Sequence, residues 1–256
     1  MHSVLFDIGP LTLYTYGFIL AVSFLVSIWV AAWRAGKFGF TRDSVYDSVF
    51  PVLISALAGA KLFYLAIEWD EFLRGLAAGP GAVISLLRGG LVYYGGVLGG
   101  SAGAVLWLWR RKLPVLGFGD MAAPALAIGH ALGRIGCFFN GCCYGRPVAW
   151  GIVLPELSDG LPRHPVQLYE AGGSLLIALA LLARGVPRPE RRGEILGTYL
   201  ASYSILRFAL EYLRDDPRGP VVLGLSIAQL MSAVALLIGL WLVLAPGLRG
   251  QKGRPA

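Results

Sequence analysis

The sequence predicts an all-α, polytopic membrane protein with about seven transmembrane helices and a small outer loop region. Of the 256 residues, 56% are hydrophobic and only 14% are charged, and the mean hydropathy is +0.66. A soluble domain carries about 25% charged residues. The 35 glycines agree with this class, because glycine is more frequent in membrane helices than in soluble ones. Seven apolar stretches are long enough to cross a bilayer, which takes about 20 residues.

In chain order, the predicted spans lie near 11–33, 45–67, 90–109, 119–139, 166–183, 194–213 and 222–245. The fourth and sixth stretches are the least apolar, because they carry Arg134 and Arg207. We expect a single integral membrane domain over 1–256, with an outer loop region at about 140–165 and a cytoplasmic tail at about 246–256. The first stretch differs from a secretory signal peptide, because no lysine or arginine precedes it.

The positive charges of the loops predict the orientation. Thirteen of the 22 lysines and arginines follow the first, third and fifth stretches or lie in the C-terminal tail, and six lie on the opposite side. The larger group consists of Arg34, Lys37, Arg42, Arg110, Arg111, Lys112, Arg184, Arg188, Arg191, Arg192, Arg249, Lys252 and Arg254. Cytoplasmic loops are rich in Lys and Arg, so we expect the N-terminus outside and the C-terminus in the cytoplasm. The net charge of +7 therefore reports topology, and no nucleic-acid partner is expected.

Ionisable residues inside the predicted helices indicate a site near the outer leaflet. His130 and Arg134 lie four residues apart and so share a helix face. An ionisable group in a span costs a few kcal/mol unless it faces protein or water. The predicted orientation brings further polar residues to the same level, namely Tyr93, Tyr94, Arg163, His164, Gln167, Glu170, Arg207 and Glu211. We infer a cavity that opens to the outer leaflet and binds an anionic headgroup.

Structural interpretations compete with this functional one. Arg207 and Glu211 are also typical of an ion pair inside a bundle. Arg134 has no acidic residue three or four positions away, so its partner lies on another element or is a ligand. His130 can equally bond a carbonyl group of a neighbouring helix, and Tyr16 fits an interfacial aromatic belt.

Two further features have structural readings. Asp120 is as typical of a helix N-terminus as of a site. The glycines at 95–96 and 99–100 favour close packing of helices over a ligand contact.

The three cysteines lie within seven residues of one another, at Cys137, Cys142 and Cys143. A bridge from Cys137 to either of the others is one interpretation, since the predicted outer side is oxidising. A thiol made reactive by Arg134 is a second, and small half-buried side chains are a third. A zinc site is weaker, because the chain has only three histidines to add to the thiols, at 2, 130 and 164.

Several motifs match one known family in order. The first is the run 133–141, Gly-Arg-Ile-Gly-Cys-Phe-Phe-Asn-Gly. The others are 8–10 with 14–17, 59–62, 163–170, 203–214 and 225–232. Together they resemble the bacterial prolipoprotein diacylglyceryl transferases over almost the whole chain. The chain departs from the family pattern at four positions, with Cys137 for asparagine, Cys142 for glutamate, Tyr94 for histidine and Ser204 for glycine.

The resemblance implies an enzyme of the bacterial cytoplasmic (inner) membrane. It would transfer a diacylglyceryl group from phosphatidylglycerol to the cysteine thiol of a lipoprotein precursor at the outer face, forming a thioether. Arg134 and Arg207 are implied to stabilise the phosphate of the leaving group. Tyr94 and His130 are the first candidates for handling the thiol proton, and His164 is another.

The implied substrate-binding residues are Tyr16, Asn140, Arg163, His164, Gln167, Glu170, Tyr203 and Glu211. The implied partners are phosphatidylglycerol, a precursor with a lipobox cysteine, and membrane lipid. No metal or soluble cofactor is required. The alternative is an anionic-lipid-binding or thiol-redox membrane protein that has lost transferase activity.

Overall fold

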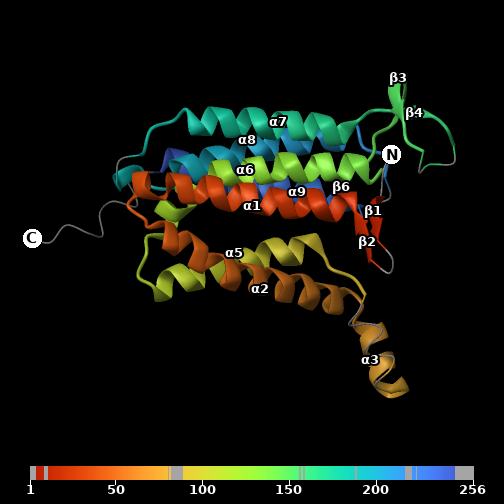
Figure 1. The fold of residues 1–256 in the computed structure, drawn as a ribbon, viewed down its shortest axis with the longest axis horizontal. Helices are drawn as coiled ribbons and strands as arrows, with labels where there is room; N and C mark the ends of the chain where they lie inside the picture. Colours follow the sequence, from red (N-terminus) through yellow and green to blue (C-terminus); the bar gives the residue numbers. More distant parts are fainter. Residues whose placement is uncertain are drawn as a thin grey trace, which may run out of the picture. The chain divides into compact units, whose positions relative to one another are not determined.

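The computed structural model describes residues 4–8, 11–79, 81, 89–155, 157, 159–187, 189–216, 221–222 and 224–245. Its helices (Figure 1) are α1 (Thr15–Ala35), α2 (Arg42–Ile67), α3 (Trp69–Ala78), α5 (Tyr93–Arg110), α6 (Val115–Phe139), α7 (Val166–Leu182), α8 (Glu194–Glu211) and α9 (Ile227–Leu244). Two short 3-10 turns cover Gly36–Phe38 and Pro189–Arg191. The predicted cytoplasmic tail at 246–256 lies outside the described residues, as do His2 and Arg188.

The predicted apolar stretches coincide with α1, α2, α5, α6, α7, α8 and α9. Among the described helices, four segments are long and apolar enough to cross a membrane, at Thr15–Phe38, Arg42–Ile67, Val115–Phe139 and Ile227–Leu244. α7 is apolar but shorter. The helical, polytopic membrane fold is confirmed, whereas the number of seven spans and their orientation stay predictions.

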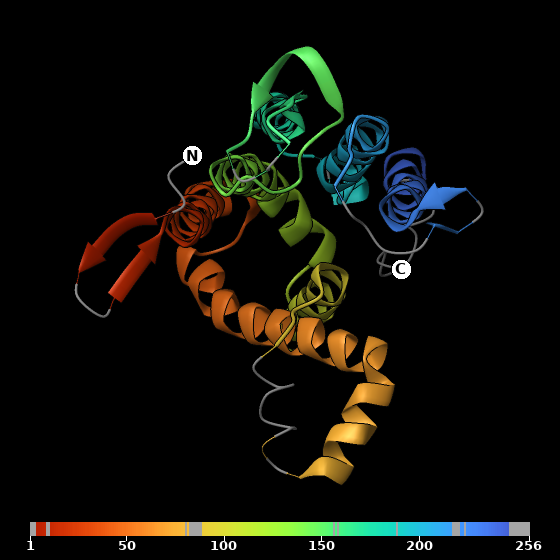
Figure 2. The same cartoon turned by 90° about the vertical axis from the view of Figure 1, so that its right-hand side faces the viewer.

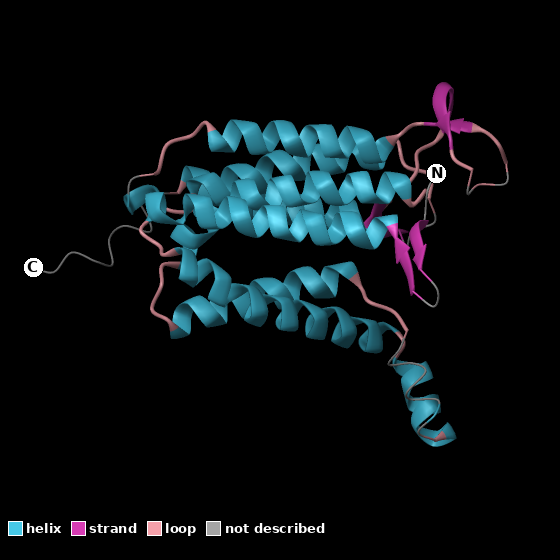
Figure 3. Cartoon of the chain, viewed as in Figure 1, coloured by secondary structure: helices cyan, strands magenta, loops and turns pink. Residues whose placement is uncertain are grey.

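Three two-stranded antiparallel sheets were not predicted (Figure 3). They pair β1 (Val4–Ile8) with β2 (Leu11–Tyr14), β3 (Pro147–Val153) with β4 (Pro162–Arg163), and β5 (Val221–Val222) with β6 (Leu225–Ser226). The predicted starts of the first and last spans are therefore wrong by several residues. Residues 11–14 pair with β1, and Thr12 Oγ1 donates to Asp7 Oδ1 at 2.6 Å. Short apolar strands next to a span add to its hydropathy, which explains the error.

The helix α3 was also not predicted, because its ten residues are too few to span a bilayer. It exposes Trp69, Leu73 and Leu76. These residues are spaced four and three positions apart, so they share one face of the helix. Such a face is typical of a helix that lies in the membrane interface.

The contacts divide the chain into two compact units. Unit 2, Phe40–Val115, holds α2, α3 and α5. α2 and α5 approach so closely that a Cβ atom on Gly59 would collide with the Gly95 carbonyl oxygen and lie 2.7 Å from Gly99 Cα. This confirms the predicted role of these glycines in helix packing. The single membrane domain over 1–256 stays a prediction.

Unit 1, Met1–Gly39 with Leu116–Ala256, holds α1, α6, α7, α8 and α9. Figure 2 looks along these helices, with α6 (green) beside α1 (red) and α7 (teal), and α8 beside α9. A buried apolar cluster joins α6, α7 and α8 through Ala123, Ala127, Ala178, Leu181, Ile195 and Tyr199.

The buried carboxylate of Asp120 fixes the start of α8. It accepts hydrogen bonds from the backbone N–H groups of Gly193 at 2.6 Å and Leu196 at 2.9 Å. The structure therefore gives Asp120 a capping role, on a neighbouring helix. Arg134 lies 14 positions further along α6, a rise of about 21 Å at 1.5 Å per residue.

Candidate functional site

The candidate site is built around Glu170, which lies in the second turn of α7 and is almost fully buried. Its Oε2 atom lies 3.0 Å from Arg134 Nε on α6. Its Oε1 atom accepts a hydrogen bond from the Tyr203 hydroxyl on α8 at 2.6 Å and lies 3.9 Å from Arg207 Nε. One carboxylate thus joins three helices. The partner of Arg134 is a residue on another element, which is one of the two alternatives that the sequence left open.

Arg207 also pairs within its own helix. Its Nη1 atom lies 2.6 Å from Glu211 Oε2, and the other carboxylate oxygen of Glu211 accepts a hydrogen bond from Ser226 Oγ at 2.6 Å. Ser226 is the residue that caps α9, and its side chain accepts a hydrogen bond from the Gln229 backbone at 3.2 Å. We call Arg134, Glu170, Arg207 and Glu211 the charged cluster.

The exposure of these side chains decides which groups an incoming molecule meets. The guanidinium side chains of Arg134 and Arg207 are 16% and 11% exposed, whereas Glu170 and Glu211 are 1% and 3% exposed. The carboxylates therefore lie beneath the arginines and hold them in place. A ligand that enters the cluster contacts positive charge first, so the arrangement favours an anion.

A hydrogen-bonded relay leads from the cluster to His130. The His130 Nε2 atom lies 2.9 Å from the Tyr203 hydroxyl oxygen, and the two rings lie 4.4 Å apart. Because Tyr203 donates its single hydroxyl proton to Glu170, Nε2 of His130 must carry the N–H that Tyr203 accepts. In the neutral ring Nδ1 then holds the lone pair, which is the form of a histidine that can take a proton.

The loop after α6 contacts the cluster through its cysteines. Arg134 Nη1 lies 3.8 Å from Cys143 Sγ, and Gln167 Nε2 donates to the Cys142 carbonyl oxygen at 2.6 Å. The three cysteines are free thiols, and their Sγ atoms all lie within 4.8 Å of one another. Hydrogen bonds from the other two thiols, and then the positive charges of Arg214 and Arg134, lower the pKa of the Cys143 thiol.

Arg163 and His164 lie in the neighbouring loop region and have other partners. Arg163 bridges Asp159 at 2.5 Å and Asp215 at 2.6 Å, and its Nη1 donates to the Gly145 carbonyl oxygen at 3.3 Å. The Arg163 hydrogen bond lowers the pKa of the Asp159 carboxyl group. These contacts hold the segment that follows the cysteines.

The ring of His164 contacts two aromatic residues. Its Nδ1 lies 3.3 Å from the Tyr169 hydroxyl, and its ring meets the edge of Trp150 at 5.0 Å. None of these partners of Arg163 and His164 belongs to the charged cluster. Their substrate-binding roles stay predictions.

The remaining predicted site residues are placed separately. Tyr16 is exposed at the start of α1, and its ring lies beside Gly136 of α6, 3.3 Å from where a Cβ atom would stand. Asn140 is exposed just past the end of α6. Tyr94 is half-buried and belongs to unit 2, where its ring packs against Tyr93. Its proposed proton-handling role stays a prediction.

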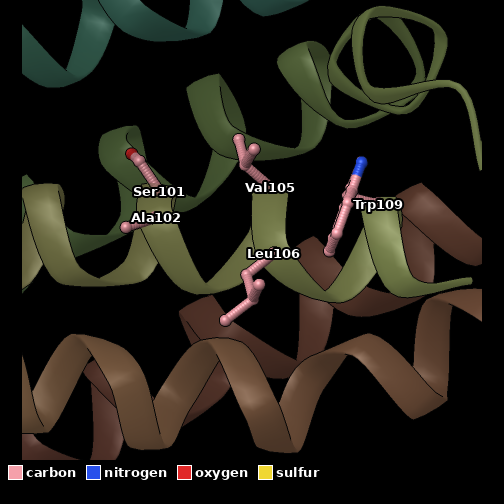
Figure 4. Close-up of a pocket in the computed structure, with 5 residues that line it drawn as sticks. All are labelled: Ser101, Ala102, Val105, Leu106 and Trp109. Carbon is pink, nitrogen blue, oxygen red and sulfur yellow. The ribbon is translucent and has the colours of Figure 1, made fainter.

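One contact of the cluster was missed in the sequence, that of Ser226 with Glu211. Ser226 belongs to a capping box with Gln229, a pattern that can be read as a helix start but does not indicate a contact with Glu211. The surface hollow in Figure 4 is a different feature. Its five lining residues, Ser101, Ala102, Val105, Leu106 and Trp109, all lie on α5 in unit 2. None of the five is charged, and none belongs to the charged cluster.

Comparisons with known proteins agree over nearly the whole chain. Residues 3–245 match the family model of prolipoprotein diacylglyceryl transferase. The phosphatidylglycerol–prolipoprotein diacylglyceryl transferase 2 of Clostridium perfringens is 33% identical, with 98% of each chain covered. The phosphatidylglycerol–prolipoprotein diacylglyceryl transferase of Bacillus anthracis is 33% identical, covering 98% of this chain and 94% of the relative. That of Pseudoalteromonas translucida is 32% identical, covering 94% and 91%.

Proposed function

Because this chain belongs to the prolipoprotein diacylglyceryl transferase family, we propose that its charged cluster is where the reaction named by its relatives takes place. The chain is a membrane enzyme that transfers a diacylglyceryl group from phosphatidylglycerol to a prolipoprotein. The observation that carries the assignment of the site is the pair of guanidinium groups held over two more deeply buried carboxylates.

The reaction explains why two arginines are needed. A precursor thiolate attacks the glyceryl carbon next to the phosphate, so a carbon–sulfur bond forms while the carbon–oxygen bond to phosphate breaks. Glycerol phosphate leaves, and its phosphate gains negative charge as the bond breaks. Arg134 and Arg207 are fixed by Glu170 and Glu211 before substrate arrives, so they stabilise this charge without reorganising. A guanidinium also binds a phosphate through two parallel N–H hydrogen bonds, whereas the ammonium group of a lysine offers only a point charge.

The thiol proton needs an acceptor, and we assign this role to His130, because a hydrogen bond to Tyr203 joins it to the charged cluster. Its contact with Tyr203 links it to the same carboxylate that holds Arg134. The relay orients the ring and leaves Nδ1 as the basic nitrogen. Gln167 and Arg163 support the reaction indirectly, by holding the loop from Cys142 to Gly145.

We further propose that the site faces the outer leaflet of the cytoplasmic membrane, with the N-terminus outside. The uneven distribution of loop lysines and arginines supports this orientation. The acceptor is then the lipobox cysteine of a precursor that has reached the outer face. In this proposal the diacyl chains stay between helices. The chemistry then uses only side chains of this protein.

The assignment is tested by transfer in vitro. Purified protein receives phosphatidylglycerol labelled in its acyl chains and a precursor peptide with either cysteine or serine at the acceptor position. We expect label in the cysteine peptide, through a bond that resists ester hydrolysis, and none in the serine peptide. Binding of the lipid without transfer to either peptide would instead support the alternative of a lipid-binding or thiol-redox protein, for which the three free thiols are the favouring observation.

A further inference from the structure

The last turn of α6 brings two of the three cysteines together. The Cys142 N–H donates to the Cys137 carbonyl oxygen at 3.3 Å, and the Gly141 N–H donates to the Phe138 carbonyl oxygen at 3.1 Å. Gly141 has a φ of 69°, in the left-handed region. These features define a Schellman motif, in which the residue after the left-handed glycine folds back over the last helical turn. Cys142 and Cys137 occupy the two positions whose side chains meet in that motif.

The third cysteine joins them at the expense of backbone strain. Cys143 has a φ of 64°, which residues other than glycine rarely adopt and which is concentrated at ligand clamps and active sites. The result is that the three Sγ atoms lie within 4.8 Å of one another. Among the described residues, no histidine or carboxylate joins this group.

A positive charge lies beside one of the three thiols, that of Cys143. Arg134 Nη1 lies 3.8 Å from Cys143 Sγ, and a nearby guanidinium stabilises a negative sulfur. Gln167 Nε2 donates a hydrogen bond to the Cys142 carbonyl oxygen, which holds the loop in this conformation. All three side chains are half-buried, which leaves the cluster accessible to a small ion.

We propose that Cys137, Cys142 and Cys143 form a three-thiolate site for a soft monovalent metal ion, Cu⁺. Thiolates select soft metal ions. Three sulfurs at about 2.3 Å from one ion lie about 4 Å apart, a spacing compatible with the structure. Zn²⁺ prefers four protein ligands in a structural site, whereas Cu⁺ accepts three. Binding releases the thiol protons to solvent and changes no oxidation state.

A disulfide accounts for less of the geometry. It uses two sulfurs, which the Schellman motif already supplies as Cys137 and Cys142. A disulfide between these two does not explain why Cys143 adopts a left-handed backbone conformation that brings its thiol to the other two. The proposal does not depend on transferase activity, because metal binding is measured without lipid or precursor.

The test is a titration of reduced, purified full-length protein with Cu⁺ against a chromogenic Cu⁺ chelator. We expect one tightly held Cu⁺ per chain and a near-ultraviolet sulfur-to-copper charge-transfer band. Each single Cys→Ser variant should bind at least about 10-fold more weakly, since even changes to groups outside the ligand set cost 10–100-fold in affinity. Wild-type protein with its thiols alkylated is the matched control, because its sequence is unchanged.

A second readout covers the case of a variant that fails to fold. Mass spectrometry counts the thiols of wild-type protein that react with a maleimide, with and without one equivalent of Cu⁺. Protection of all three thiols supports the site. The proposal would be overturned if wild-type protein retained no more Cu⁺ than the alkylated control. It would also be overturned if two of the thiols formed a disulfide in air and the protein, once reduced, bound no Cu⁺.

Discussion

Exchanging Arg134 and Glu170 together for glutamine separates the structural role of this ion pair from its role in transfer. The pair joins α6 to α7 at 3.0 Å, with the carboxylate almost fully buried. Arg134→Gln leaves the Glu170 carboxylate with only the longer contact to Arg207, at 3.9 Å, and Glu170→Gln leaves the Arg134 guanidinium without this carboxylate. The double exchange removes both charges, and Arg207 keeps Glu211 at 2.6 Å.

The magnitudes follow from burial. Removing one partner of a buried ion pair costs about 3–5 kcal/mol of stability, because the other charge remains unpaired. The double variant should lose less than the sum of the single losses, with a coupling of about 0.5–3 kcal/mol. Transfer should behave differently. Loss of a group that stabilises developing charge costs about 10²–10³-fold in kcat, and neutralising Glu170 as well does not restore it.

Unfolding in mixed detergent micelles and transfer per folded molecule are measured on the same samples. The matched control is Arg184→Gln with Glu194→Gln, because that pair lies at 3.2 Å but Arg184 is 43% exposed. An exposed pair contributes about 0–1 kcal/mol, and these two residues lie outside the charged cluster. Transfer by the Arg134→Gln/Glu170→Gln variant at the wild-type rate would refute a role for Arg134 at the phosphate. If Arg134→Gln or Glu170→Gln lowered the free energy of unfolding no more than the control does, the stability argument from burial of this pair would be wrong.

The remaining predictions concern orientation, proton transfer and capping. A reporter fused after Lys112 should be cytoplasmic, because the positive loops alternate along the chain, and a periplasmic signal would reverse the inferred orientation. His130→Ala should slow transfer more than Tyr94→Phe, since His130 contacts Tyr203 at 2.9 Å; full activity of both variants would place the base elsewhere. Asp120→Ala should lower stability by about 1–2 kcal/mol through loss of the α8 cap, with transfer per folded molecule unchanged; an unaltered unfolding midpoint would contradict that role.

Helix positions were predictable because a bilayer imposes a length and a polarity on each span. The positions of α2 and α6 follow from long apolar stretches, and the few charged residues within those stretches stand out against that background. The strands β1 and β2 were missed because a short apolar strand beside a span only extends its hydropathy. Pairing between such strands depends on a turn, which hydropathy does not register.

Within the site, predictability depended on sequence separation. Arg207 and Glu211 stand four residues apart, so helix periodicity alone brings them together. Arg134 and Glu170 come from different helices, and only the packing of α6 against α7 decides that they pair. The depth expected from loop charges placed both residues at one level, but it did not identify the contact. The convergence of the cysteines depends on left-handed backbone at Gly141 and Cys143, which no periodic pattern records.

The claim that two arginines stabilise a departing phosphate is tested most directly by identifying what leaves. Phosphorus NMR follows the lipid phosphate while mass spectrometry counts the modified precursor peptide in the same reaction. We expect one glycerol phosphate for each thioether formed by the wild-type protein, and about 10²–10³-fold slower formation of both products by the Arg134→Gln/Glu170→Gln variant. Release of glycerol with the phosphate left on the lipid, or thioether formed by the variant at the wild-type rate, would contradict the proposed role of the charged cluster.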